Sequence, residues 1–158
     1  MQTVRWEFYP LVAHNAVTRT FIEELAQVRK SPSTLDNYGR DLEDFLQAVS
    51  ALPFEDVLEA DETLIAQYVD GLWSRPARRG SGHQTSRDKI TYVTGSKLSL
   101  NTIRRRLSTI RVFFDWCIRV HRRQNPLNPV PKGVRGKKRG LIGYARSRAL
   151  DSQREPVC

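Results

Sequence analysis

The sequence predicts an all-α protein, a small bundle of four to five helices. Three observations support this prediction. Apolar residues recur at intervals of three and four in several separate stretches, which is the period of an amphipathic helix. Good N-capping residues precede these stretches. No alternating apolar pattern of useful length indicates a long β-strand.

The first part of the chain predicts an extended segment followed by two helices. Residues 1–13 carry apolar side chains without a clear period, and we interpret them as an extended lead-in. Residues 15–30 predict the first helix. A second helix is predicted over 32–50, because Ser31 is a good N-cap and Pro32 suits the first helical position. The expected core positions are Ala16, Phe21, Leu25 and Val28 in the first helix and Leu35, Tyr38, Leu42 and Phe45 in the second.

Two further helices are predicted on either side of a long loop. Asp61 can cap a short helix over 61–73. Residues 75–97 are rich in Gly, Ser, Pro and basic side chains and exceed the roughly 12–15 residues of ordinary connections, so we expect a mobile basic loop, with a short hairpin around 90–93. The clearest helix follows Ser99 and ends before Asn125-Pro126. Its apolar stripe is Leu100, Ile103, Leu107, Ile110, Phe114 and Cys117.

These elements predict one helical domain over 14–130, followed by a flexible basic linker or tail over 131–158. No stretch approaches the roughly 20 apolar residues of a membrane span, and the N-terminus has no apolar signal-peptide core. The two cysteines, Cys117 and Cys158, cannot form a disulfide framework. We therefore expect a cytoplasmic protein without a membrane or small-molecule partner.

The charge is distributed very unevenly along the chain. Residues 1–74 hold 5 basic and 13 acidic side chains, a net charge of −8, whereas residues 75–158 hold 21 and 4, a net charge of +17. A basic excess of this size is typical of a surface that binds a polyanion, most often nucleic acid. The alternative is a solubilising tail.

Arginines gather in the first turns of the last predicted helix. On a helical wheel Arg105 points away from the core, Arg104 and Arg111 lie on one flank, and Arg106 lies on the other. The guanidinium fork pairs with phosphate or guanine in a bidentate manner, and many DNA-binding proteins present the early turns of a helix to the groove. The alternatives are a solvated basic face or arginines that pair with the acidic first half. The polar side chains interleaved with them are Asn101, Thr102 and Ser108.

Two segments resemble a known family. SPSTLDNYGRDLEDFL (31–46) resembles the first signature of the core-binding, SAM-like domain of tyrosine recombinases, the phage integrase superfamily. LSLNTIRRRLSTIRVFFDWCIRVHRRQNPLNPV (98–130) resembles its second signature. The resemblance implies a helical bundle that forms one half of a clamp around duplex DNA at recombination sites. It also implies that other recombinase protomers on the DNA are partners.

The resemblance also implies which residues contact DNA. Helices corresponding to 32–50 and 99–121 approach the major groove in relatives, and a basic interdomain linker crosses the DNA. The resemblance implies contacts at Thr34, Asn37, Thr102, Arg105, Arg106 and Arg111, with linker contacts at Lys132, Arg135, Lys137, Lys138 and Arg139. The arginine-rich side of the last helix adds Asn101, Arg104 and Ser108 as candidate contacts.

The chemistry of the family resides in a second domain that supplies arginines, a lysine, histidines and a nucleophilic tyrosine. This sequence contains no His-x-x-Arg, and its tyrosines have no supporting constellation. We therefore expect a non-enzymatic front half of a recombinase. The spacing of its residues predicts neither a metal site nor a cofactor.

A helical protein-interaction module is the alternative function. Acidic side chains of the first two helices would form a face for a basic partner or a full-length recombinase. These residues are Glu23, Glu24, Asp41, Glu43 and Asp44.

Overall fold

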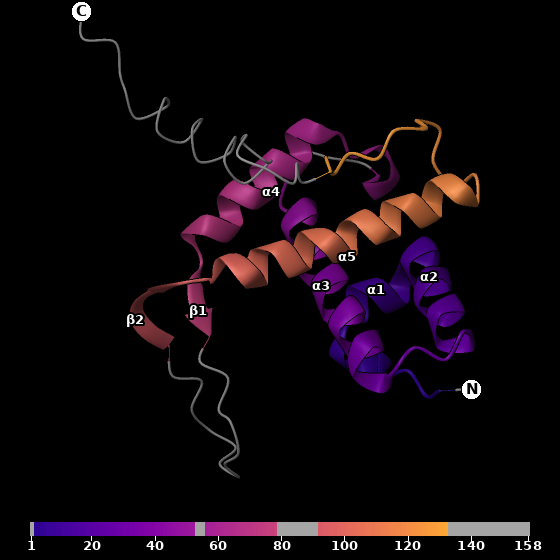
Figure 1. Ribbon diagram of the computed structural model, residues 1–158, viewed down its shortest axis with the longest axis horizontal. Coiled ribbons are helices and arrows are strands. Elements are labelled where there is room, and N and C mark those ends of the chain that lie inside the picture. The colour runs from indigo at the N-terminus through magenta and orange to yellow at the C-terminus, as the bar shows by residue number, and fades with distance from the viewer. Residues whose placement is uncertain (1, 53–55, 79–91, 133–158) are drawn as a thin grey trace, which may run out of the picture.

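A computed structural model describes residues 2–52, 56–78 and 92–132, and within them it confirms the helical bundle. The main helices are α2 (Ala16–Gln27), α3 (Pro32–Ser50), α4 (Glu62–Ser74) and α5 (Leu100–Arg119). Helix α5 runs across the centre, with α4 on one side of it and α2 on the other (Figure 1). The expected caps are present, since Ser31, Asp61 and Ser99 each accept a hydrogen bond from a backbone N–H in the first turn of their helix.

The core is built around the apolar stripe of α5. Ile103, Ile110, Phe114 and Cys117 of this stripe are fully buried. They pack with Leu42 and Phe45 of α3, Ile22 of α2, and Ile65 and Leu72 of α4. The predicted core of α3 is confirmed at Leu35, Leu42 and Phe45, whereas Tyr38 is half-buried against Phe21.

The buried face of α2 differs from the predicted one. Ala16 is exposed, and Val28 is 67% exposed at the end of the helix. The prediction is confirmed at Phe21, and the helix also buries Thr18, Ile22 and Ala26. The apolar pattern does not predict the burial of Thr18. Its hydroxyl donates a hydrogen bond to the carbonyl oxygen of Val12 at 3.0 Å, so this polar side chain can be buried.

The prediction of an extended lead-in over 1–13 is wrong. Residues Trp6–Phe8 form a 3₁₀ turn, η1, and Pro10–His14 form a short helix, α1. Tyr9 and Val12 are buried in the main core. Gly39 makes this possible, because the Tyr9 ring packs directly on it and a Cβ there would lie 2.8 Å from the ring. Glu43 caps α1 by accepting the N–H groups of Leu11 and Val12 at 3.1 and 2.9 Å.

Part of the predicted basic loop forms a β-ribbon. Strand β1 (Pro76–Arg78) pairs antiparallel with β2 (Tyr92–Lys97), with Pro76 opposite Lys97 and Arg78 opposite Tyr92. The unequal spacing of these pairs indicates a bulge, which bends and twists a ribbon. The ribbon differs from the short hairpin predicted around 90–93, because residues 92 and 93 lie within one strand and pair with the chain just after α4. Residues 79–91 lie outside the described residues.

The chain after α5 returns along the outside of the bundle. A short 3₁₀ turn, η2 (Val57–Glu59), supports it, because Arg123 donates to the carbonyl oxygens of Leu58 and Leu127. Arg123 is only 7% exposed and stacks over the Phe114 ring, and its burial lowers its pKa. Val130 then enters the core.

Candidate nucleic-acid interface

The first half of α5 carries the arginine cluster. Arg104 and Arg105 are both exposed, whereas Arg106 and Arg111 on the flanks are partly buried, which agrees with the helical wheel. Arg104 lies on the same side of the helix as the exposed Asn101 and Ser108, and it makes no ion pair within the described residues. We call the exposed set Asn101, Arg104, Arg105 and Ser108 the α5 face.

Arg105 is held by a buried carboxylate. Its Nη1 donates to Asp41 Oδ2 at 2.8 Å, and Thr109 Oγ1 donates to the same oxygen at 2.9 Å. Asp41 is 2% exposed, and its burial raises its pKa although the Arg105 guanidinium opposes this shift. The Arg105 side chain remains 45% exposed. One end of the guanidinium is therefore fixed while the rest faces solvent.

Arg106 points into the fold. Its Nη1 lies 2.9 Å from Asp44 Oδ2, and its side chain is 19% exposed. Asp44 also accepts the Tyr68 hydroxyl at 2.7 Å and an N–H of Arg75. Burial and the neighbouring Asp44 carboxylate both raise the pKa of Tyr68, which remains a neutral donor. Arg106 is thus part of an internal network between α3, α4 and α5. It was predicted to contact DNA, but its side chain is mostly buried.

Arg111 is also engaged within the chain. It donates to the carbonyl oxygen of Val130, and its Nε lies 3.9 Å from Asp115 Oδ2. Asn128 closes the same junction by donating to the Arg111 carbonyl oxygen at 2.9 Å and to Asp115 at 2.8 Å. Arg111 therefore secures the returning segment.

The remaining predicted contacts fall into three groups. Thr34 and Thr102 are half-buried, and their hydroxyls pair with the N-capping Ser31 and Ser99 at 2.7 and 2.9 Å. Asn37 on α3 and Lys132 after α5 are exposed. The other predicted linker contacts, Arg135, Lys137, Lys138 and Arg139, lie outside the described residues.

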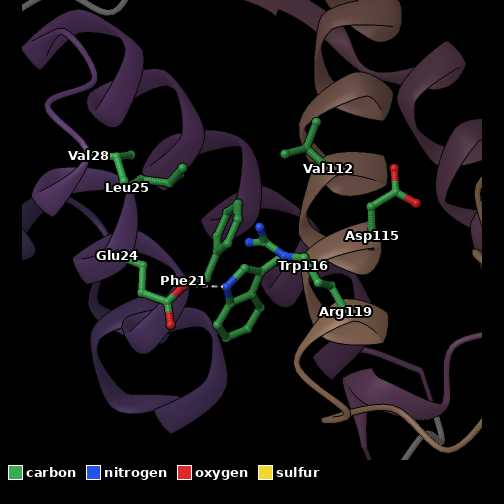
Figure 2. Close-up of a pocket in the computed structure, with 8 residues that line it drawn as sticks. All are labelled: Phe21, Glu24, Leu25, Val28, Val112, Asp115, Trp116 and Arg119. Atoms are coloured by element: carbon green, nitrogen blue, oxygen red, sulfur yellow. Dashed lines mark hydrogen bonds between the residues drawn. The ribbon is translucent and has the colours of Figure 1, made fainter.

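The acidic side chains of the alternative function have partners inside the chain. The clearest case is Glu24, whose Oε2 accepts the indole N–H of Trp116 at 2.7 Å (Figure 2). Glu43 caps α1, and Asp41 and Asp44 bind arginines. Glu23 pairs with Arg19 at 2.9 Å. These contacts leave little of the predicted acidic face open to a basic partner.

A shallow pocket lies between α2 and the second half of α5, with a volume of about 340 Å³. Phe21, Leu25, Val28, Val112 and Trp116 give it a mainly apolar lining, with Glu24, Asp115 and Arg119 at its edge (Figure 2). Across the described ranges, no group of three or more His, Cys, Asp or Glu side chains has the geometry of a metal site. No helix among these residues has the length and apolar character to cross a bilayer.

The sequence alone leaves the roles of Asp41 and Asp44 open between an exposed acidic face and carboxylates that pair with the arginines. The structure supports the second alternative, since Arg105 and Arg106 are the partners that allow these carboxylates to be buried. The available signal was their spacing of three on α3, which places them on one side of the helix, together with consecutive arginines on another helix. That pattern fits an internal ion-pair seam as well as it fits two separate charged surfaces.

Comparisons with known proteins agree with the resemblance of the two signature segments. The family model described as the phage integrase N-terminal SAM-like domain matches residues 19–121, which is well over half of the chain. Neither the curated proteins nor the solved structures gave a match. The matched range begins in α2, ends just after α5 and contains the α5 face. The chain therefore belongs to the family of phage integrase N-terminal SAM-like domains.

Proposed function

We propose that this chain binds duplex DNA through the α5 face, as the clamp-forming half of a tyrosine recombinase. Family membership supports a recombinase-related role in DNA binding. The observation that carries the proposal is the exposure of Arg104 on this face without a carboxylate partner among the described residues, while the adjacent Arg106 is neutralised inside the fold. An exposed, unpaired guanidinium on the early turns of a helix is available to a phosphate or a base edge.

Arg105 complements Arg104 in this proposal. Asp41 holds one Nη atom of its guanidinium, so fewer rotamers need to be frozen when the remaining donors meet DNA. Asp41 acts here as a positioning residue. The exposed amide of Asn101 and hydroxyl of Ser108 lie beside these arginines and provide hydrogen bonds to phosphates or base edges.

We further propose that this chain breaks no DNA strand itself. The sequence lacks the His-x-x-Arg motif, and none of its tyrosines has the constellation of a nucleophile. Tyr68, for example, donates a hydrogen bond to Asp44, and burial raises the pKa of its hydroxyl, which is the reverse of nucleophile activation. Relaxation of supercoiled plasmid by the purified chain would overturn this part of the proposal.

The binding test uses Arg104→Ala, with Arg122→Ala as the matched control. Both side chains are exposed and both substitutions remove one positive charge, but Arg122 lies beyond the opposite end of α5. Duplex binding is followed by fluorescence anisotropy at several salt concentrations. Arg104→Ala should weaken binding and reduce the slope of log K against log salt by about 0.9, the value of one phosphate contact. Arg122→Ala should leave the slope unchanged.

Equal effects of the two substitutions would refute the α5 face as the interface. Arg104 is the better probe than Arg105 or Arg106, because each of those neutralises a carboxylate of α3 and its loss would also affect folding. Circular dichroism of each variant confirms that the helices are intact before binding is compared.

A further inference from the structure

We propose that the β1–β2 ribbon is a second DNA-binding element, held by Asp44 so that it contacts the same duplex as the α5 face. This inference rests on the proposed function and adds a site that the family match does not assign. The candidate site consists of the ribbon backbone over 76–78 and 92–97 together with Arg75 and Lys97 at its base.

Both ends of the ribbon are fixed to the bundle. Arg75 donates to Asp44, and its backbone N–H bonds the carbonyl oxygen of Leu72 in α4 at 3.3 Å. On the other strand, the N–H of Leu98 bonds the Arg75 carbonyl oxygen at 3.3 Å, and the Leu98 side chain packs on the core. The ribbon is therefore anchored on α4 and α5 at once, which fixes its direction relative to α5.

Asp44 connects the ribbon to the arginines of α5. Its carboxylate is shared by Arg75 at the ribbon base and Arg106 of α5, and Asp41 holds Arg105 one turn earlier along α3. Two carboxylates on one side of α3 thus hold three arginines from two separate elements side by side. The base of the ribbon is contiguous with the arginine cluster as a result.

The ribbon lies next to the first turn of α5. Only Leu98 and Ser99 separate Lys97 at the end of β2 from Leu100 at the start of α5, and Figure 1 shows the ribbon projecting from that end of the helix. A duplex bound along the first turns of α5 therefore passes close to the base of the ribbon.

The chemistry of the ribbon suits a polyanion. Arg75 and Lys97 stand at its base, its first strand ends at Arg78, and its described strands contain no acidic residue. Lys97 is exposed. A two-stranded ribbon fits the major groove, and basic side chains at its base reach the adjacent phosphates.

Site-specific crosslinking to DNA tests the inference. Single cysteines replace Lys97, Ser108 or Arg122 in a Cys158→Ser background and carry a benzophenone photoprobe. Cys117 remains in place because it is buried. With a duplex at low salt, probes at 97 and 108 should both crosslink to DNA, whereas the probe at 122, beyond the far end of α5, should not.

The outcomes separate the two proposals. A crosslink at 108 without one at 97 overturns the ribbon inference and leaves the α5 face intact, while no crosslink at either position overturns both. Asp44→Asn tests the positioning role, and it should reduce the crosslink at 97 while the crosslink at 108 persists. Equal loss at both positions, or no loss at 97, contradicts a specific role of Asp44 in orienting the ribbon. Asp44→Glu, which keeps the charge, should recover part of the yield at 97.

Discussion

Replacing Arg105 by alanine should destabilise the fold far more than replacing Arg104, although the two are adjacent and both are exposed. Arg105 donates the charged hydrogen bond that neutralises Asp41, whose own exposure is 2%. A hydrogen bond to a charged group contributes about 1.5–3 kcal/mol, and we take about 1–2 kcal/mol because the Arg105 side chain is 45% exposed and water can replace part of it. Arg104→Ala, at an unpaired surface position, should change stability by less than about 0.5 kcal/mol.

The pH dependence identifies the cause of this loss. Burial raises the pKa of folded Asp41 above its ordinary value of 3.8, so the folded state binds the proton more tightly than the unfolded chain. The unfavourable contribution of charged Asp41 therefore develops as pH rises from about 3.8 through the raised value. Arg105→Ala removes the strongest influence that lowers this pKa, so the penalty extends to higher pH. As the pH falls towards 3.8 and Asp41 takes up its proton, the variant and the parent should approach the same stability.

Urea unfolding followed by circular dichroism measures these differences at neutral and mildly acidic pH. A loss of about 1–2 kcal/mol corresponds to a fall in Tm of roughly 2–8 °C for a chain of this size. The double variant Asp41→Asn with Arg105→Ala should recover most of the loss, because no buried charge then lacks its partner. If Arg105→Ala and Arg104→Ala prove equally stable at neutral pH, Asp41 does not depend on Arg105 and the positioning argument fails.

Three further predictions concern the core and its caps. Gly39→Ala should lower the unfolding free energy by about 1 kcal/mol, since overpacking against the buried Tyr9 ring outweighs the gain in helix propensity; a higher Tm would contradict this. Glu43→Ala should lower the free energy of unfolding in urea by about 1 kcal/mol, because α1 loses its cap. Gln47→Ala is the neutral control, since Gln47 is exposed and lies in α3, the helix that also carries Glu43. Burial raises the pKa of the Cys117 thiol to about 12, so in a Cys158→Ser chain a thiol reagent should label it only after denaturation; rapid labelling of the native chain would disprove its burial.

The local features of the fold could be predicted from the sequence because their causes are local. Ser31 and Pro32 define the start of α3 through capping and a preset φ angle, and the observed helix covers 32–50 as expected. The apolar stripe of α5 likewise follows from a spacing of three and four. Each of these signals is contained within a few neighbouring residues.

The features that were mispredicted depend on contacts between distant residues. The helix over 10–14 is held by Gly39, which admits the Tyr9 ring, and by Glu43, which caps the first turn. Neither role can be recognised from the N-terminal segment alone. The fate of the arginines has the same origin, because only the packing of α3 on α5 decides that Arg106 meets Asp44 while Arg104 meets solvent.

The opposite charges of the two halves of the chain therefore serve the fold as well as the surface. Carboxylates of α3 neutralise Arg75, Arg105 and Arg106, and backbone carbonyl oxygens accept hydrogen bonds from Arg111 and Arg123. Each of these five arginines is therefore held by a partner within the chain. A guanidinium fixed by a buried carboxylate loses less rotamer freedom on binding than a solvated one. It also neutralises less phosphate charge, because its own charge is already partly balanced by the carboxylate. In the proposed interface Arg104 supplies the unpaired charge and Arg105 the fixed geometry. Two adjacent residues of one helix would in this way divide affinity and orientation between them, and the total charge of the chain overestimates how many of its arginines are free to pair with a phosphate.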